Sequence, residues 1–401
     1  MSDLLKIFIT FVLILVLIRK KVAMGHVMLI SSVALFFLYG MNISGIVAAA
    51  RKAFLSSVTI KLLLSLSLIR IFELVLREKN VLSSMMATVK DSFASRKAIM
   101  ISMPMLIGML PSLGGAYFSA PMVKEATDDM PMSQEEKAFI NYWFRHPWEY
   151  MLPLYPGIVF ASAVSGIPLS SLVMANAIYA AAMIMTGFIF SMQGSSSAAE
   201  SGLRNPVQAG ERQWMSFLPL LSVLILVLIV HIELHVALIL VLIPLFFFYR
   251  YGIAKVLHAL QYGFSLDVIV MIAGIVLFKE TMEASGAVAN LSRFFVEHGI
   301  PALPIVCLLP FIAGLLTGHT IGFVGSTFPM LLSIVDQVSL SLISLAFASG
   351  LIGVLLSPVH LCLVLSREYF RADLSGIYRK TIPASIIVFG VAALRYLLMR
   401  S

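Results

Sequence analysis

Apolar runs recur along the whole chain, and short polar stretches separate them. Most of these runs approach the ~20 consecutive apolar residues that a helix needs to cross the ~30 Å hydrocarbon core of a bilayer. They predict an all-α polytopic membrane protein. The expected crossings are residues 4–18, 22–40, 53–76, 136–166, 168–192, 215–231, 233–249, 264–280, 337–366 and 376–399.

Two further apolar stretches, residues 99–123 and 301–332, are interrupted by small residues. In the first, Pro111, Gly114 and Gly115 leave two arms of roughly a dozen residues or fewer, too short to cross a bilayer. Irregular backbone is tolerated at membrane depth only where protein or a water-filled cavity satisfies its polar groups. We therefore expect two re-entrant hairpins that enter the membrane and return, with a site at their tips.

The elements follow the same order in both halves of the chain. Residues 1–192 and 214–401 each contain five expected transmembrane helices and one hairpin, and a polar linker of residues 193–213 joins them. An odd number of crossings places the second half upside down, which makes an inverted-topology repeat. Amphipathic stretches at 80–97 and 281–298 precede the two hairpins and predict helices lying along the membrane surface.

Composition agrees with membrane insertion. The chain is 60% hydrophobic and only 12% charged, with a mean hydropathy of +0.99, whereas soluble proteins are about 25% charged. Its net charge of +8 fits the Lys and Arg bias of cytoplasmic loops, so we expect a multi-pass protein of the cell (inner) membrane and no nucleic-acid partner. Cys307 and Cys362 both lie in apolar runs, and their spacing predicts neither a disulfide nor a metal site.

The hairpin tips are the first candidates for ligand binding. Glycine lets a ligand approach the backbone closely, and the helix that begins after each tip directs free N–H groups and a partial positive charge at it. An anion is therefore favoured, although small residues can also serve only to pack helices closely in lipid. The candidate substrate-binding residues at the tips are Ser112, Gly114, Gly115, Tyr117, Ser119, Gly318, His319, Thr320, Gly325, Ser326 and Thr327.

The segment after each hairpin is longer than one crossing requires. About 30 residues would make a straight helix of ~45 Å, against a core of ~30 Å, so each segment is expected to be interrupted. The breaks are expected around residues His146 to Gly157 in the first half and around Ser357 and Pro358 in the second, with His360 just beyond. Hairpin tips and broken helices that meet at mid-depth are typical of the substrate site of a secondary transporter.

The first broken segment also carries the densest cluster of ionisable groups in an apolar region. Intramembrane charges are expensive and are functional candidates by default. Arg145 could hold a substrate carboxylate or pair with Glu149 one helical turn away, and Glu149 or His146 could carry a proton. Asn141 and Ser357 complete the substrate-binding candidates. The alternative is that these residues lie at the membrane interface beside an aromatic belt.

Four motifs resemble those of a known group of membrane proteins. They read MLPSLGGAYFSAPMV, EEKAFINYWFRHPWEYMLPLYPG, GLLTGHTIGFVGSTFP and LLSPVHLCLVLS. Together they resemble an uncharacterised ten-span family of the ion-transporter superfamily, related to gluconate permeases and to dicarboxylate and citrate carriers. The resemblance covers nearly the whole chain and implies a homodimer whose transport domain, built from hairpins and broken helices, moves like an elevator. The sodium-coupled dicarboxylate carriers place Ser-Asn-Thr triplets at their hairpin tips, and this chain has none, which favours protons over sodium.

We therefore expect a secondary active transporter of a small organic anion, such as a carboxylate or a sugar acid. Protons or Na⁺ would drive it, no cofactor is expected, and no catalytic residue is predicted. The expected partners are the small anionic substrate, the lipid bilayer and a second copy of the chain. Two alternatives remain open at this point, namely a membrane-embedded enzyme acting on lipid or peptide, and an ion channel.

Overall fold

The computed structural model describes most of the chain, and all regular structure in the described part is helical. The described residues are 3–20, 22–92, 95–111, 115–128, 130–191, 214–287, 290, 298, 301–335 and 337–399. The predicted linker, half of the second amphipathic stretch, and the site candidates Ser112 and Gly114 lie outside them.

The helices include two that the sequence did not predict, at residues 43–55 and 253–263. In the first half they are α1 (Asp3–Arg19), α2 (Met24–Leu38), α3 (Ile43–Leu55), α4 (Ser57–Glu78), α5 (Val81–Ser92), α6 (Arg96–Gly108), α7 (Gly115–Thr127), α8 (Gln134–Trp143), α9 (Pro147–Met151), α10 (Pro156–Ser165) and α11 (Leu169–Ser191). In the second half a short 3₁₀ helix (Met215–Phe217) precedes α13 (Leu218–Leu228), α14 (Leu234–Phe248), α15 (Ile253–Gly263), α16 (Leu266–Ala284), α18 (Ala302–Thr317), α19 (Thr320–Ile334), α20 (Leu340–Leu355), α21 (Leu361–Phe370) and α22 (Leu374–Met399). The helical stretches 169–191, 253–284 and 374–399 are long and apolar enough to cross a membrane.

One predicted crossing has a different boundary. The stretch 53–76 was expected to be one span, but the chain divides it between α3 and α4. Ser56 marks the division, because its Oγ accepts a hydrogen bond from the Thr59 backbone N–H at 3.2 Å and caps α4. A serine N-cap is a weak signal inside an apolar run, which is why hydropathy alone missed it.

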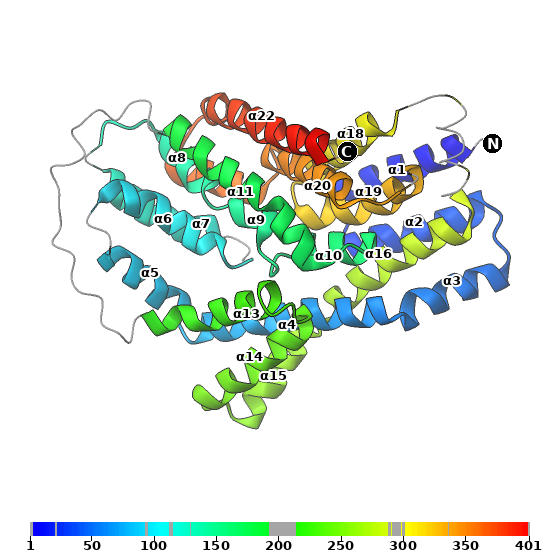
Figure 1. The fold of residues 1–401 in the computed structure, drawn as a ribbon, viewed down its shortest axis with the longest axis horizontal. Coiled ribbons are helices and arrows are strands. Elements are labelled where there is room, and N and C mark those ends of the chain that lie inside the picture. Colours follow the sequence, from blue (N-terminus) through cyan, green and yellow to red (C-terminus); the bar gives the residue numbers. More distant parts are fainter. Residues whose placement is uncertain are drawn as a thin grey trace.

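The helices pack in two groups, which Figure 1 shows from one side. The peripheral group is α1–α4 with α13–α16, and the central group is α6–α11 with α18–α22. Within the peripheral group α2 crosses α16 so closely that a Cβ added to Gly274 would lie 2.3 Å from the Gly25 carbonyl oxygen. Helices α14 and α15 protrude from the rest of the molecule (Figure 1).

Each predicted hairpin is a pair of short helices that pack on each other, α6 on α7 and α18 on α19. The arms contain 13, 13, 16 and 15 residues, which gives them lengths of about 20–24 Å. Each arm also carries one internal proline, which removes a helical hydrogen bond: Pro104, Pro121, Pro310 and Pro329. Each arm spans less than the ~30 Å hydrocarbon core, as do α2 and α14 with 15 residues each.

Both long segments after the hairpins are interrupted where the sequence predicts. The first is divided into α8, α9 and α10, with Pro147 and Pro156 at the first turns of α9 and α10, where the missing N–H costs nothing. The second is divided between α20 and α21 by residues 356–360. After its break each segment contacts the hairpin of the other half, since α10 packs on α19 and α21 packs on α7.

The start of α8 is tied to the start of α22. Ser133 and Glu136 form a capping box, with the Glu136 N–H donating to Ser133 Oγ at 3.2 Å. Glu136 Oε1 also accepts from Lys380 Nζ at 3.0 Å. The neighbouring Glu135 accepts from the Asp373 backbone N–H at 3.1 Å, and this hydrogen bond lowers the pKa of the Glu135 carboxyl. These contacts join the outer end of the first broken segment to the chain that follows the second broken segment.

Candidate functional site

The tips of both hairpins lie directly against the helix breaks. At the first tip, a Cβ added to Gly115 would lie 1.8 Å from Arg145 Nη1. At the second tip, a Cβ on Gly318 would lie 3.1 Å from the His360 backbone nitrogen and 3.2 Å from Ser357 Oγ. Only glycine leaves room at these positions, so the backbone of each hairpin tip lies directly against the residues of a helix break.

The end of α6 is fastened to the first break. A Cβ on Gly108 would lie 2.1 Å from the Arg145 carbonyl oxygen, and the Tyr155 hydroxyl donates to the Gly108 carbonyl. Trp148 Nε1 donates to the Met105 carbonyl at 2.7 Å. These contacts hold the Arg145 side chain in a buried position, where it is only 3% exposed.

Asn141 joins three elements of the site. Its Nδ2 donates to the Ala116 carbonyl of α7 at 3.0 Å and to Ser366 Oγ of α21 at 2.8 Å. Its Oδ1 is buried and has no hydrogen-bond partner among the described residues. A buried acceptor left unpaired costs about 1–3 kcal/mol, so this atom favours a polar ligand nearby.

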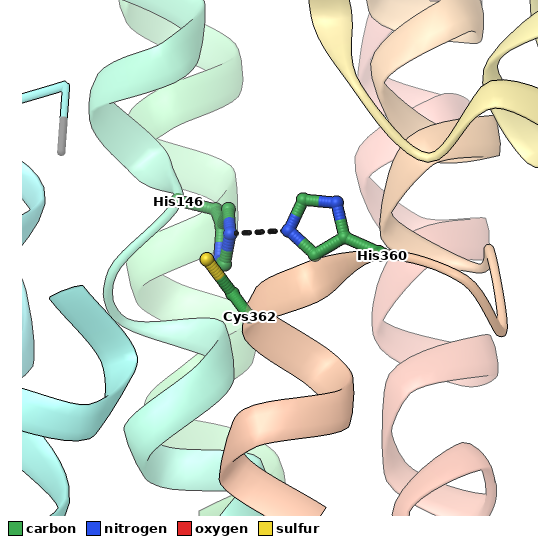
Figure 2. Close-up of side chains that lie close together, drawn as sticks. All are labelled: His146, His360 and Cys362. Atoms are coloured by element: carbon green, nitrogen blue, oxygen red, sulfur yellow. Dashed lines mark hydrogen bonds between the residues drawn. The ribbon is translucent and has the colours of Figure 1, made fainter. Parts of the chain in front are cut away.

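Two buried histidines face each other across the breaks, one from each half (Figure 2). Their Nε2 atoms are 3.0 Å apart. The Nδ1 atom of His146 lies 2.6 Å from the Tyr142 carbonyl oxygen, and that of His360 lies 2.7 Å from the Gly318 carbonyl oxygen. Glu149 Oε1 lies 3.7 Å from His146 Nε2. The second histidine therefore links the first break to the tip of the second hairpin.

Residues 1–399 match the family described as "Protein of unknown function (DUF401)". The chain belongs to this family. No curated protein matches it. The relationship to gluconate permeases and citrate carriers therefore stays a prediction from the motifs.

Several residues predicted for the site in this DUF401 protein do meet at its centre. Gly115, Arg145, His146, Glu149, Gly318 and Ser357 lie at the contacts between tips and breaks. Thr320 lies beside them, since a Cβ on Gly157 would be 2.6 Å from the Thr320 Cβ. Arg145 and Glu149 are not joined by one helix, because α8 ends at Trp143. The i, i+4 spacing on which their ion pair was predicted does not apply there.

Other predicted residues use their side chains elsewhere. The hydroxyls of Ser119, Ser326 and Thr327 donate to carbonyls one turn earlier in their own helices. Tyr117 is 50% exposed and packs edge-on against Tyr369. All four are polar residues on the hairpins, and sequence spacing alone does not show in which direction their side chains point.

The remaining two candidates lie at the margins of the site. Gly325 faces the peripheral group, where a Cβ would lie 2.9 Å from Ile275 and 3.3 Å from Met24. His319 is exposed, with Nδ1 3.0 Å from the Thr317 carbonyl oxygen. Gly325 thus marks a close contact between helix groups.

His360, Cys362 and Gly157 belong to the site although they were not chosen from the sequence. His360 and Cys362 stand next to the second break in the run SPVHLC. The correspondence between the two halves is the signal that points to them, because it aligns this break with the one at His146. Gly157 was recognised as part of a break, but nothing in the sequence indicated its contact with the other half.

Gly318→Ala tests the second tip. Gly318 has a φ of +68°, a conformation that costs about 1–2 kcal/mol for a residue with a Cβ. Gly166 is a matched control, because it has a φ of +74° and no neighbour within 4 Å of an added Cβ. We expect both variants to lower Tm, Gly318→Ala more so because of its close neighbours, and only Gly318→Ala to weaken substrate uptake and ligand-induced thermal shift as well. Equal uptake in the two variants would show that the tip does not contact the ligand.

Proposed function

We propose that this DUF401 protein is a secondary active transporter for a small organic anion, such as a carboxylate or a sugar acid. The observation that carries the proposal is the meeting of both hairpin tips and both helix breaks at one buried cluster around Arg145. Discontinuous helices at mid-depth are the common way in which transporters form a substrate site. The inverted ten-span repeat is part of the same proposal, since the two halves repeat the order of hairpin, broken segment and long helix.

The anion preference rests on the charge and backbone at the first tip. The Arg145 guanidinium lies against Gly115, the first residue of α7, so its charge adds to the partial positive charge of a helix N-terminus. A guanidinium can donate two parallel hydrogen bonds to one carboxylate. The unpaired Asn141 Oδ1 would accept from a hydroxyl group, which favours a hydroxylated acid.

The elevator-type movement is proposed from the two helix groups. A cavity of about 460 Å³ separates α4 and the α13–α14 turn from α10, at the boundary between the groups. The peripheral group exposes large apolar side chains on α14 and α15, including Phe247, Phe248 and Ile253. These surfaces suit lipid or a second copy of the chain, and the peripheral group would then be the fixed part of a homodimer.

The test is uptake by purified protein reconstituted in liposomes, after a thermal-shift screen of carboxylates, sugar acids and inorganic oxyanions. A ligand that binds the native state raises Tm by mass action, and we expect saturable uptake of the hits. Imposed pH and Na⁺ gradients then separate the two coupling ions, of which protons are the prediction, with Glu149 and His146 as the proposed carriers. Flux that does not saturate would favour a channel, and chemical turnover without net uptake would favour an enzyme.

A further inference from the structure

The two facing histidines are part of a larger group of donor atoms, of which the proposed transport uses only His146 and Glu149. The ligand atoms of His146, His360 and Cys362 all lie within 4.8 Å of one another, and Figure 2 shows the three side chains converging from the two breaks. His146 and His360 are 1% and 6% exposed. Glu149 adds a carboxylate oxygen 3.7 Å from His146 Nε2.

The hydrogen bonds of the two imidazoles determine where their protons lie. Each Nδ1 faces a backbone carbonyl oxygen, at 2.6 Å for His146 and 2.7 Å for His360. A carbonyl oxygen only accepts, so each Nδ1 carries a hydrogen and, in a neutral ring, each Nε2 has a bare lone pair. The two lone pairs then face each other at 3.0 Å. This arrangement is repulsive unless a cation lies between them.

The surrounding donors indicate which cation fits. A proton shared by two nitrogens needs no third donor, whereas a metal ion needs further donors, and the Cys362 thiol supplies one. Tetrahedral coordination with metal–nitrogen bonds of 2.0–2.1 Å would place the two nitrogens about 3.3 Å apart, close to the 3.0 Å in this structure. Histidines that bind metals characteristically donate their other N–H to a backbone carbonyl or a carboxylate.

We propose that His146, His360 and Cys362 bind a divalent transition-metal ion. Imidazole and thiolate donors select zinc-like ions over Mg²⁺ or Ca²⁺, which prefer oxygen. The ion would join the breaks of the two halves, and through the His360 contact with the Gly318 carbonyl it would also fix the second hairpin tip. The inference goes beyond the proposed function, and a bound ion would leave Glu149 rather than His146 as the proton carrier.

Co²⁺ is the probe, because its absorption spectrum reports both geometry and ligand type. The full-length protein is purified in detergent, treated with a chelator and titrated with Co²⁺, with Mg²⁺ as the control ion. We expect one Co²⁺ per chain, intense visible bands of a four-coordinate ion and a thiolate-to-cobalt charge-transfer band. Binding is also expected to release the thiol proton, and Zn²⁺ should displace Co²⁺.

Variants separate the site from other ligands on the surface. Cys362→Ser should remove the charge-transfer band. His360→Ala should weaken Co²⁺ binding by about 100-fold or more, because the loss of a residue that only hydrogen-bonds to a ligand can already weaken binding by up to about 100-fold. Cys307→Ser and His258→Ala change the other cysteine and an exposed histidine of α15 and should leave the spectrum unchanged. Absence of Co²⁺ binding by the wild-type protein, or a spectrum unaffected by Cys362→Ser, overturns the proposal whether or not His360→Ala folds. The spectra are recorded without substrate or vesicles, so their outcome is separate from that of the uptake assay.

Discussion

Arg145→Ala is expected to weaken saturable anion uptake severely. Removing one partner of a buried, hydrogen-bonded charge pair costs about 2–5 kcal/mol, and each ~1.4 kcal/mol is tenfold in affinity. The affinity for the anion should therefore fall at least about 30-fold. Arg145→Lys should recover only part of it, because an ammonium lacks the planar fork that binds a carboxylate through two parallel hydrogen bonds. Uptake in liposomes and ligand-induced thermal shift measure the two effects.

A second arginine provides the control for this result. Arg395 is partly buried in α22 and donates to the Tyr179 hydroxyl at 3.3 Å and to Ser344 Oγ at 3.2 Å, away from the hairpin tips. Arg395→Gln should lower Tm without removing uptake. Normal uptake by Arg145→Ala, or equal losses in both variants, would contradict the role of Arg145 as the anion-binding residue.

Gly314→Ala is expected to cause a large loss of stability. Helix α18 crosses α20 so closely that a Cβ on Gly314 would lie 2.2 Å from the Gly350 carbonyl oxygen. The neighbouring contact is equally tight, since a Cβ on Gly353 would lie 2.1 Å from the Phe311 carbonyl oxygen. Backbone atoms cannot rotate away as a side chain can, so the helices must separate, at a cost of about 1–3 kcal/mol or more. Thermal unfolding in detergent should show a Tm lower by several degrees.

Gly390→Ala is the matched control for this crossing. Gly390 also lies inside a helix, α22, but an added Cβ there meets no atom within 4 Å. Alanine is favoured over glycine within helices by roughly 0.5–1 kcal/mol, so this variant should be as stable as the wild type or slightly more so. A similar Tm for Gly314→Ala would mean that α18 and α20 are farther apart in the membrane than in this structure.

The helical fold and its interruptions could be predicted because their signals are local. Apolar runs, Pro147, Pro156 and the glycines of the tips each determine the backbone within a few residues of themselves. The division at Ser56 was missed because a single capping serine is a small perturbation of a long apolar run. It is also the kind of boundary that hydropathy describes least well.

The site was predicted less completely because it depends on which side chains face each other. Ser326 and Thr327 looked like ligand-binding groups, but their hydroxyls donate to their own helix, as such residues often do in apolar surroundings. His360 and Cys362 were not predicted, because in the sequence the densest ionisable cluster lies around Arg145 in the first half. Only the tertiary structure places the second break 3.0 Å from the first, through the two Nε2 atoms.

Each hairpin packs on the broken segment of the other half, and this affects the order in which the protein can fold. The first hairpin packs on α21 and the second on α10, so α6 and α7 leave the ribosome more than two hundred residues before their partner helix is made. During that interval their polar tip has no native neighbour from the second half. Membrane insertion of the first half is therefore separated in time from its folding, which ends only when α21 has been synthesised.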